Sequence, residues 1–246
     1  MRRKLVVGNW KMHGTRPQNA ELLAALRAAR PFGVDVAVCV PFVFLSETAA
    51  ALAGSEIRWG AQDVSPHERG AYTGEISAAM LAECGCRYAI VSHSERRAHH
   101  GESDLHSAHK AQAALARGVT PIVCVGETLA EREAGRTEVV VKRQLSVVIH
   151  QLAHCAAEIV VAYEPIWAIG TGLSATPEQA QAVHAVLRAQ LQAATGRAEH
   201  MTILYGGSVK PDNAAALFAQ PDIDGGLVGG ASLVAGDFIA ICRASL

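Results

Sequence analysis

The feature that most constrains the fold of this chain is a regular alternation of short apolar runs with Ala-rich stretches. Eight runs rich in Val and Ile start about 31 residues apart on average, which is the size of one βα unit. These runs lack the period-2 alternation of half-exposed strands, as strands buried on both faces do. We expect strands at 5–9, 36–40, 57–61, 88–92, 120–125, 159–163, 202–206 and 223–228.

The stretches between these runs carry helical patterns and are rich in Ala, the residue with the highest helix propensity. The expected helices include 17–30, 77–85, 94–100, 105–117, 138–152, 177–195 and 232–243. Strict βα alternation predicts an α/β fold with a parallel sheet. Eight units without a linker favour a closed (β/α)8 barrel, one domain over residues 1–246, rather than a doubly wound sheet. The first run ends in Gly8-Asn9-Trp10-Lys11, without the Gly-rich turn typical of that alternative.

Charge and hydropathy exclude several classes of protein. The chain has 22 Lys and Arg against 23 Asp and Glu, and no basic run indicates a nucleic-acid partner. The longest apolar run, 36–45, is too short to cross a bilayer, and the apolar residues after the basic N-terminus are too few for a signal peptide. Six cysteines, two of them inside apolar runs, indicate reduced packing residues. We therefore expect a cytoplasmic protein that binds neither nucleic acid nor membrane.

Polar residues directly follow five of the expected strands. In a barrel of this kind the ends of the strands meet at one mouth, where functional groups lie. The residues are Asn9 and Lys11, then His93, then Glu164, then Gly206-Gly207-Ser208, and finally Gly229-Gly230. Both glycine pairs precede expected helix starts, at 210 and 232, and backbone N–H groups at a helix N-terminus bind anions. Each residue alone also fits an ordinary structural role, but together they indicate a site for a small phosphorylated molecule.

The segment 164–176 is a long βα connection that carries the apolar side chains of Trp167 and Ile169. Gly170 and Gly172 permit backbone movement, while a proline and a helix-capping sequence fix the two ends. Such a segment is typical of a lid that closes over a ligand and excludes water. The alternative is a loop packed permanently against the core.

Five motifs together resemble the triosephosphate isomerase family, in order and spacing over residues 8 to 233. They are Gly8-Asn9-Trp10-Lys11-Met12, Ser92-His93-Ser94-Glu95-Arg96-Arg97, Ala162 to Gly172 (AYEPIWAIGTG), Tyr205-Gly206-Gly207-Ser208-Val209 and Leu227-Val228-Gly229-Gly230-Ala231-Ser232-Leu233. The resemblance implies a TIM barrel. It also implies an isomerase that interconverts D-glyceraldehyde 3-phosphate and dihydroxyacetone phosphate through an enediol(ate), in glycolysis and gluconeogenesis. Because this reaction only moves protons, we expect no cofactor and no metal.

The resemblance also implies a role for each matching residue. Glu164 is the base that moves the proton between the two carbons, and His93 is a neutral imidazole that polarises the carbonyl and moves protons between the oxygens. The start of the expected helix 94–100 disfavours a charged ring at His93. Lys11 offsets negative charge, and Asn9 donates to the substrate oxygens. Phosphate contacts are implied for Gly170, Ser208, Gly229 and Gly230, and supporting roles for Glu95, Arg96, Cys124, Tyr205 and Ser208, the last two by holding the closed lid.

The polar connection 62–75 is long for a βα loop, and such loops are usually functional or interfacial. In the family this loop inserts into a neighbouring subunit, where the residue matching Thr73 supports the partner's site, so a homodimer is expected. Two positions depart from the family pattern. Many members of the family have Lys at the position of Leu173, at the tip of the predicted lid, so this difference would affect lid kinetics rather than chemistry. Asn is often found at the position of Asp63, so the sequence does not decide a contact near Lys11 and the subunit interface.

The residues leave two other functions open. Another phosphate-binding barrel enzyme acting on a small sugar phosphate, such as a lyase or synthase, shares the glycine turns. It needs other strand-end residues, such as a Schiff-base lysine, which the expected strands 120–125 and 159–163 lack. A non-catalytic barrel would be indicated by the loss of Glu164, His93 or Lys11, and all three are present. The histidines at 99, 100, 106 and 109 lack a Cys or carboxylate with ligand spacing, so we expect no metal site there.

Overall fold

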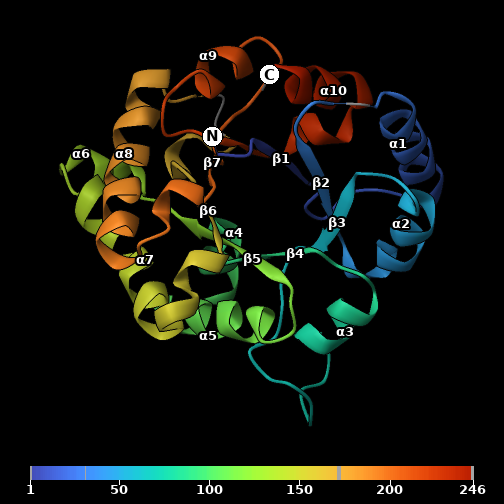
Figure 1. Ribbon diagram of the computed structural model, residues 1–246, viewed down its shortest axis with the longest axis horizontal. Coiled ribbons are helices and arrows are strands. Elements are labelled where there is room, and N and C mark those ends of the chain that lie inside the picture. Colours follow the sequence, from blue (N-terminus) through green and yellow to red (C-terminus); the bar gives the residue numbers. More distant parts are fainter. Residues whose placement is uncertain (1, 31, 171–172, 245–246) are drawn as a thin grey trace.

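A computed structural model describes residues 2–30, 32–170 and 173–244 of the chain. Eight parallel strands form a closed barrel in chain order, and β8 pairs back with β1 (Figure 1). The strands are β1 (Leu5–Asn9), β2 (Asp35–Val40), β3 (Arg58–Ala61), β4 (Tyr88–Val91), β5 (Thr120–Val125), β6 (Val160–Tyr163), β7 (Ile203–Tyr205) and β8 (Gly225–Val228). Each strand lies within two residues of the expected bounds, and the predicted (β/α)8 TIM barrel is confirmed.

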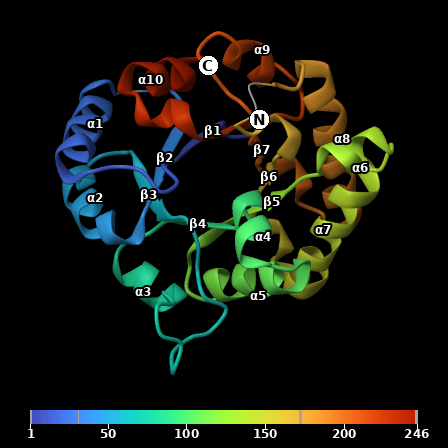
Figure 2. The same ribbon diagram turned by 180° about the vertical axis from the view of Figure 1, so that it is seen from behind.

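The helices surround the barrel on the outside, as Figures 1 and 2 show from opposite sides. They are α1 (Arg16–Ala28), α2 (Leu45–Leu52), α3 (Ala78–Glu83), α4 (Ser94–His100), α5 (Asp104–Leu115), α6 (Leu129–Glu133), α7 (Thr137–Leu152), α8 (Pro177–Ala194), α9 (Ala214–Phe218) and α10 (Ala235–Arg243). Ser77, Ser103 and Thr176 start α3, α5 and α8, each accepting a hydrogen bond from the backbone N–H three residues on. At α8 the predicted capping sequence forms a complete capping box, in which Gln179 also binds back to Thr176.

Apolar side chains cover both faces of the strands. An inner core fills the barrel and consists of Leu5, Val7, Ala37, Cys39, Ile90, Ile122, Cys124, Val160, Ala162, Leu204 and Leu227. A larger outer core lies between the strands and the helices and includes Val6, Val123, Leu187 and Phe238. Because successive strand residues point to opposite faces, two apolar faces produce the continuous apolar runs seen in the sequence. All six cysteines are free, and none of the described helices combines the length and apolarity needed to cross a membrane.

Two helix starts after the glycine pairs differ from the expected positions. α9 begins at Ala214 rather than at 210, because a turn precedes it in which Oδ1 of Asn213 accepts the backbone N–H of Lys210 at 2.8 Å. After β8 a 3-10 turn covers Gly230–Leu233, and α10 begins at Ala235 rather than at 232. The first glycine pair therefore lies on a loop, and the second opens a single 3-10 turn.

Candidate active site

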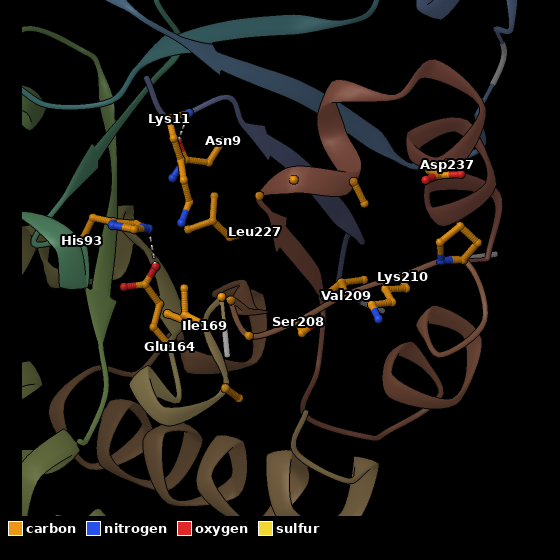
Figure 3. A pocket seen from close by; sticks show the side chains of 18 of the residues that line it. Asn9, Lys11, His93, Glu164, Ile169, Ser208, Val209, Lys210, Leu227 and Asp237 are labelled. Atoms are coloured by element: carbon orange, nitrogen blue, oxygen red, sulfur yellow. Dashed lines mark hydrogen bonds and ion pairs between the residues drawn. The ribbon is translucent and has the colours of Figure 1, made fainter. Parts of the chain in front are cut away.

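A cavity of about 740 Å³ opens at the C-terminal ends of the strands. Eight residues of the predicted site line it: Asn9, Lys11, His93, Glu164, Gly170, Ser208, Gly229 and Gly230. Figure 3 shows His93 and Glu164 on one side of this cavity and Ser208 on the other. Asn9 ends β1, and the other residues follow β1, β4, β6, β7 and β8, so closure of the barrel brings together groups that are far apart in the sequence.

Glu164 and His93 are in direct contact at this cavity. Nε2 of His93 lies 2.9 Å from Oε1 of Glu164. The other carboxylate oxygen, Oε2, accepts a hydrogen bond from the backbone N–H of Ser94 at 2.9 Å. Both side chains are buried. A buried carboxylate held between an imidazole and a backbone N–H is suited to moving protons.

The contact shifts the pKa values of both groups. Burial raises the pKa of Glu164, but the His93 ring, the Ser94 N–H and the Lys11 ammonium lower it, and the net shift is downward. Burial lowers the pKa of His93, but the carboxylates of Glu164 and Glu95 raise it, and the net shift is upward. The upward shift differs from the effect expected at the start of a helix, because the sequence did not show that Glu164 faces the ring.

Hydrogen bonds behind His93 set its tautomer and orientation. His93 is the N-cap of α4, and its Nδ1 accepts the backbone N–H of Glu95 at 3.2 Å. Since a backbone N–H only donates, the proton of the neutral ring lies on Nε2, which faces Glu164. The preceding residue, Ser92, has a φ of 68° and receives two hydrogen bonds from the guanidinium of Arg97. This strained residue sets the direction in which the chain leaves β4.

Lys11 and Asn9 form the β1 part of the site. The ammonium of Lys11 lies 2.5 Å from Oε1 of Glu95, and Oε2 of Glu95 lies 3.5 Å from Nδ1 of His93. Lys11 has a φ of 50°, rare for a residue with a side chain, and its N–H donates to Oδ1 of Asn9 at 3.0 Å. Glu95 therefore connects the cation to the imidazole without itself lining the cavity.

The two glycine pairs differ in what surrounds them. A Cβ at Gly206 would lie 2.9 Å from Cγ of Glu164, and one at Gly207 would overlap the hydroxyl of Tyr205. A Cβ at Gly229 would meet only Cε of Lys11, at 3.4 Å, and one at Gly230 would meet nothing within 4 Å. The first pair is therefore required by packing inside the protein, whereas the second leaves open space over its backbone.

A buried carboxylate anchors the first part of the predicted lid. Glu127 accepts hydrogen bonds from the hydroxyl of Tyr163 at 3.0 Å and from Nε1 of Trp167 at 2.9 Å. The guanidinium of Arg132 lies 4.5 Å from the centre of the Trp167 ring. We did not identify Glu127 from the sequence, although it follows β5 much as Glu164 follows β6. The same rule, applied to the fifth strand, finds it.

The rest of the predicted lid is only partly described. Gly170 has a φ of 70°, and Leu173 is more than half exposed. Gly172, predicted as a second flexible point, lies outside the described residues. Burial raises the pKa of Tyr205, the predicted lid support, to about 12, while the backbone of Ala175 opposes the shift.

The connection 62–75 projects from the barrel between β3 and α3, at the lower edge of Figure 1. Thr73 is exposed on it and lies outside the lining of the cavity. Asp63, at its start, is buried and forms ion pairs with Lys110 at 2.7 Å and Arg96 at 2.9 Å. The negative charge that Asp63 introduces, where the family often has Asn, is therefore balanced by two cationic side chains. Arg96, a predicted supporting residue, connects the loop to α4.

Four lining residues with titratable side chains were not identified from the sequence: His13, Lys210, Asp212 and Asp237. His13 and Lys210 directly follow motifs that carry site residues, and Asp212 comes two residues after Lys210, so the sequence held a positional signal for these three. Asp237 lies in α10 and had none. Within the described part of the chain, no group of three or more His, Cys, Asp or Glu is arranged to hold a metal ion.

The fold and the cavity define a class of protein: a barrel enzyme with a paired carboxylate and imidazole facing a glycine-lined pocket. The family model described as triosephosphate isomerase matches residues 4–245. Relatives named triosephosphate isomerase include that of Delftia acidovorans, 65% identical over 100% of both chains, and that of Paracidovorax citrulli, 64% identical over 99% of both. The chain belongs to the triosephosphate isomerase family. It interconverts D-glyceraldehyde 3-phosphate and dihydroxyacetone phosphate, a reaction of glycolysis.

Proposed function

We propose that Glu164 is the base of this isomerisation and that His93 serves the substrate oxygens. The contact of 2.9 Å between the two groups at the cavity is the observation that carries the proposal. The downward pKa shift of Glu164 keeps its carboxylate ionised at neutral pH, so it accepts the proton from C2 of glyceraldehyde 3-phosphate. At the same time His93 donates its Nε2 proton to the carbonyl oxygen on C1, which gives the enediol.

The second half of the reaction uses the same two groups. Glu164 returns the proton to C1, and the hydroxyl on C2 gives its proton to His93, which yields dihydroxyacetone phosphate. One carboxylate serves both carbons because they are adjacent in a planar enediol. Since Glu164 is bound to His93 and Ser94 in the structure, its side chain has to turn from them toward the substrate.

The remaining residues bind and shield the substrate. Lys11 offsets the charge of the phosphate and the enediolate, and Asn9 donates to the substrate oxygens. The phosphate is held by backbone N–H groups of Gly170, Ser208, Gly229 and Gly230, all of which line the cavity. Closure of the lid over the ligand, supported by Tyr205 and Ser208, excludes water and protects the enediolate. None of these steps requires a cofactor or a metal, because only protons move.

Replacing Glu164 by Gln tests the base assignment directly. We expect kcat to fall by about a thousandfold or more, because a positioned base contributes on the order of 10²- to 10⁴-fold and an amide accepts no proton. Exchange of the C1 proton of dihydroxyacetone phosphate with D₂O, followed by NMR, should stop as well. Glu133→Gln on the exposed surface of α6 is the matched control. Near-normal turnover in the Glu164 variant would reject the assignment.

We also propose that the protein acts in the cytoplasm as a homodimer joined through the loop 62–75. The loop is internally braced, since the rings of His67 and Tyr72 stack 3.7 Å apart. Apolar side chains are exposed nearby on the first three βα units, which are adjacent in the barrel: Met12, Val43, Tyr72 and Met80. A second subunit would cover this surface, and Thr73 would support the partner's site.

Light scattering and kinetics over a dilution series test the dimer. Thr73→Arg places a charge on the exposed loop, so we expect a monomer whose kcat/KM is at least about tenfold lower. Ser146→Arg adds the same charge on the exposed surface of α7, away from the loop, and is the control that should leave the dimer and kcat/KM unchanged. A monomeric protein with full activity would contradict both the interface and the supporting role of Thr73.

A further inference from the structure

Lys210 lines the cavity on the phosphate side, two residues after Ser208. Its position is held by a closed turn, because the Lys210 N–H donates to Oδ1 of Asn213 and Nδ2 of Asn213 donates to the carbonyl of Ser208 at 3.0 Å. Figure 3 shows Ser208, Val209 and Lys210 in sequence along this edge of the cavity, across from His93 and Glu164. The side chain of Lys210 is exposed to solvent at the rim.

Lys210 differs from the other lysine of the cavity in its charged neighbours. Three carboxylates line the cavity, those of Glu164, Asp212 and Asp237, against the ammonium groups of Lys11 and Lys210. The charge of Lys11 is already matched by Glu95 at 2.5 Å. Among the residues that the structure describes, no carboxylate forms an ion pair with Lys210.

A phosphate monoester carries a charge between about −1.5 and −2 at neutral pH, so it meets a lining with an excess of negative charge. Backbone N–H groups attract it only at short range, whereas an ammonium acts over about 10 Å at moderate salt. We propose that Lys210 is a phosphate-capture residue, which draws the incoming substrate phosphate toward the backbone groups of Ser208, Gly229 and Gly230. This inference rests on the phosphate site assigned under the proposed function.

Kinetics of charge variants at two ionic strengths test the proposal. Lys210→Gln should lower kcat/KM for glyceraldehyde 3-phosphate, and raise the Ki of inorganic phosphate, on the order of fivefold at low salt. In 0.5 M NaCl both changes should shrink to less than about twofold because the charges are screened. Lys210→Arg should restore the wild-type values, and kcat should change less than KM in every variant.

Two further variants separate capture from a structural effect. Asp212→Asn removes an opposite charge from the same exposed turn, so it should raise kcat/KM and lower the Ki of phosphate at low salt. Lys142→Gln removes an equal charge from the outside of α7, where Lys142 pairs with Glu138, and should change neither value. The proposal is overturned if Lys210→Gln behaves like Lys142→Gln at low salt. It is also overturned if the decrease of kcat/KM in Lys210→Gln persists in 0.5 M NaCl, or if Asp212→Asn changes kcat/KM and the Ki of phosphate in the same direction as Lys210→Gln.

The experiments distinguish a failure of the Lys210 proposal from a failure of the Glu164 assignment. Normal phosphate inhibition in Lys210→Gln, together with an inactive Glu164→Gln, would remove the capture role and keep the base. The converse result would keep Lys210 as a capture residue and remove the assignment of Glu164.

Discussion

The two sides of the cavity are built in different ways. On the side of β4 and β6, His93 and Glu164 are buried side chains, each held by a backbone N–H of the first turn of α4. On the side of β8, the lining includes the backbone of Gly229 and Gly230, and the space over Gly230 is open. Proton transfer depends on a few atoms held in fixed positions, so that side needs supporting contacts. Phosphate binding through backbone groups needs the absence of side chains.

This difference predicts that glycines on the two sides respond differently to the same substitution. A glycine packed beneath the proton-transfer side is needed by the protein itself. A glycine over the open space is needed only when the ligand is bound. Stability and substrate affinity should therefore separate in a matched pair of variants.

Gly126→Ala is expected to have the largest effect. A Cβ at Gly126 would overlap the carbonyl oxygen of Glu164, and the backbone of Gly126 is already bonded at both ends to the side chain of Gln144, at 2.8 and 3.1 Å. We expect the free energy of unfolding to fall by about 3 kcal/mol, since a core clash of this kind displaces backbone. Turnover should fall too, because Glu164 moves. If Gly126→Ala has the wild-type free energy of unfolding in urea, the protein accommodates the added methyl group and the prediction is wrong.

Gly230→Ala is expected to affect binding rather than stability. The added methyl group meets no protein atom, and Gly230 is not among the glycines with positive φ, so unfolding should change by less than about 0.5 kcal/mol. The methyl would occupy the space proposed for the phosphate, so KM and the Ki of inorganic phosphate should rise on the order of tenfold, as for one lost hydrogen bond to a charged group. An unchanged KM would place the phosphate elsewhere in the cavity.

Much of this arrangement follows from the sequence, and the reason is specific. In a closed parallel barrel the C-terminal ends of all strands face the same mouth, so a polar residue at the end of an apolar run falls near the cavity. That rule places Asn9, Lys11, His93 and Glu164 without any knowledge of distances. Glu127, two residues after β5, does not line the cavity, because its buried carboxylate is bonded to Tyr163 and to Trp167 in the predicted lid.

Two features that the sequence did not predict, the later start of α9 and the upward pKa shift of His93, depend on side-chain contacts in the folded protein. A helix start was expected at 210, but the Asn213 side chain accepts the Lys210 N–H and holds a turn, so α9 begins at Ala214. The direction of the His93 pKa shift depends on which neighbour faces the ring. The sequence indicated the start of the helix 94–100 next to His93, but it did not indicate the contact with Glu164, which forms only in the folded barrel.

The smallest expected effect concerns the titration of His93, which sharpens the description of the proton-transfer side. The Glu164 carboxylate raises the pKa of His93 against the effect of burial, so NMR of the ring nitrogens should give a pKa above 6.5 in the free enzyme. In Glu164→Gln that pKa should fall, because burial continues to lower it while the main opposing charge is lost. An unchanged pKa would mean that the two side chains do not meet in solution.

The same shifts predict how the pair contributes to stability at different pH values. The folded-state pKa of His93 is raised, so its contribution is fully present below pH 6.5 and is lost as the pH rises through that raised value. The pKa of Glu164 is lowered, so its contribution is present above pH 4.5 and is lost as the pH falls through the lowered value. The stability difference between the wild type and Glu164→Gln should therefore be largest near pH 5.5 and smaller at pH 9. Urea unfolding at both pH values and one protein concentration measures it, and a difference that grows toward pH 9 would contradict the charged pair.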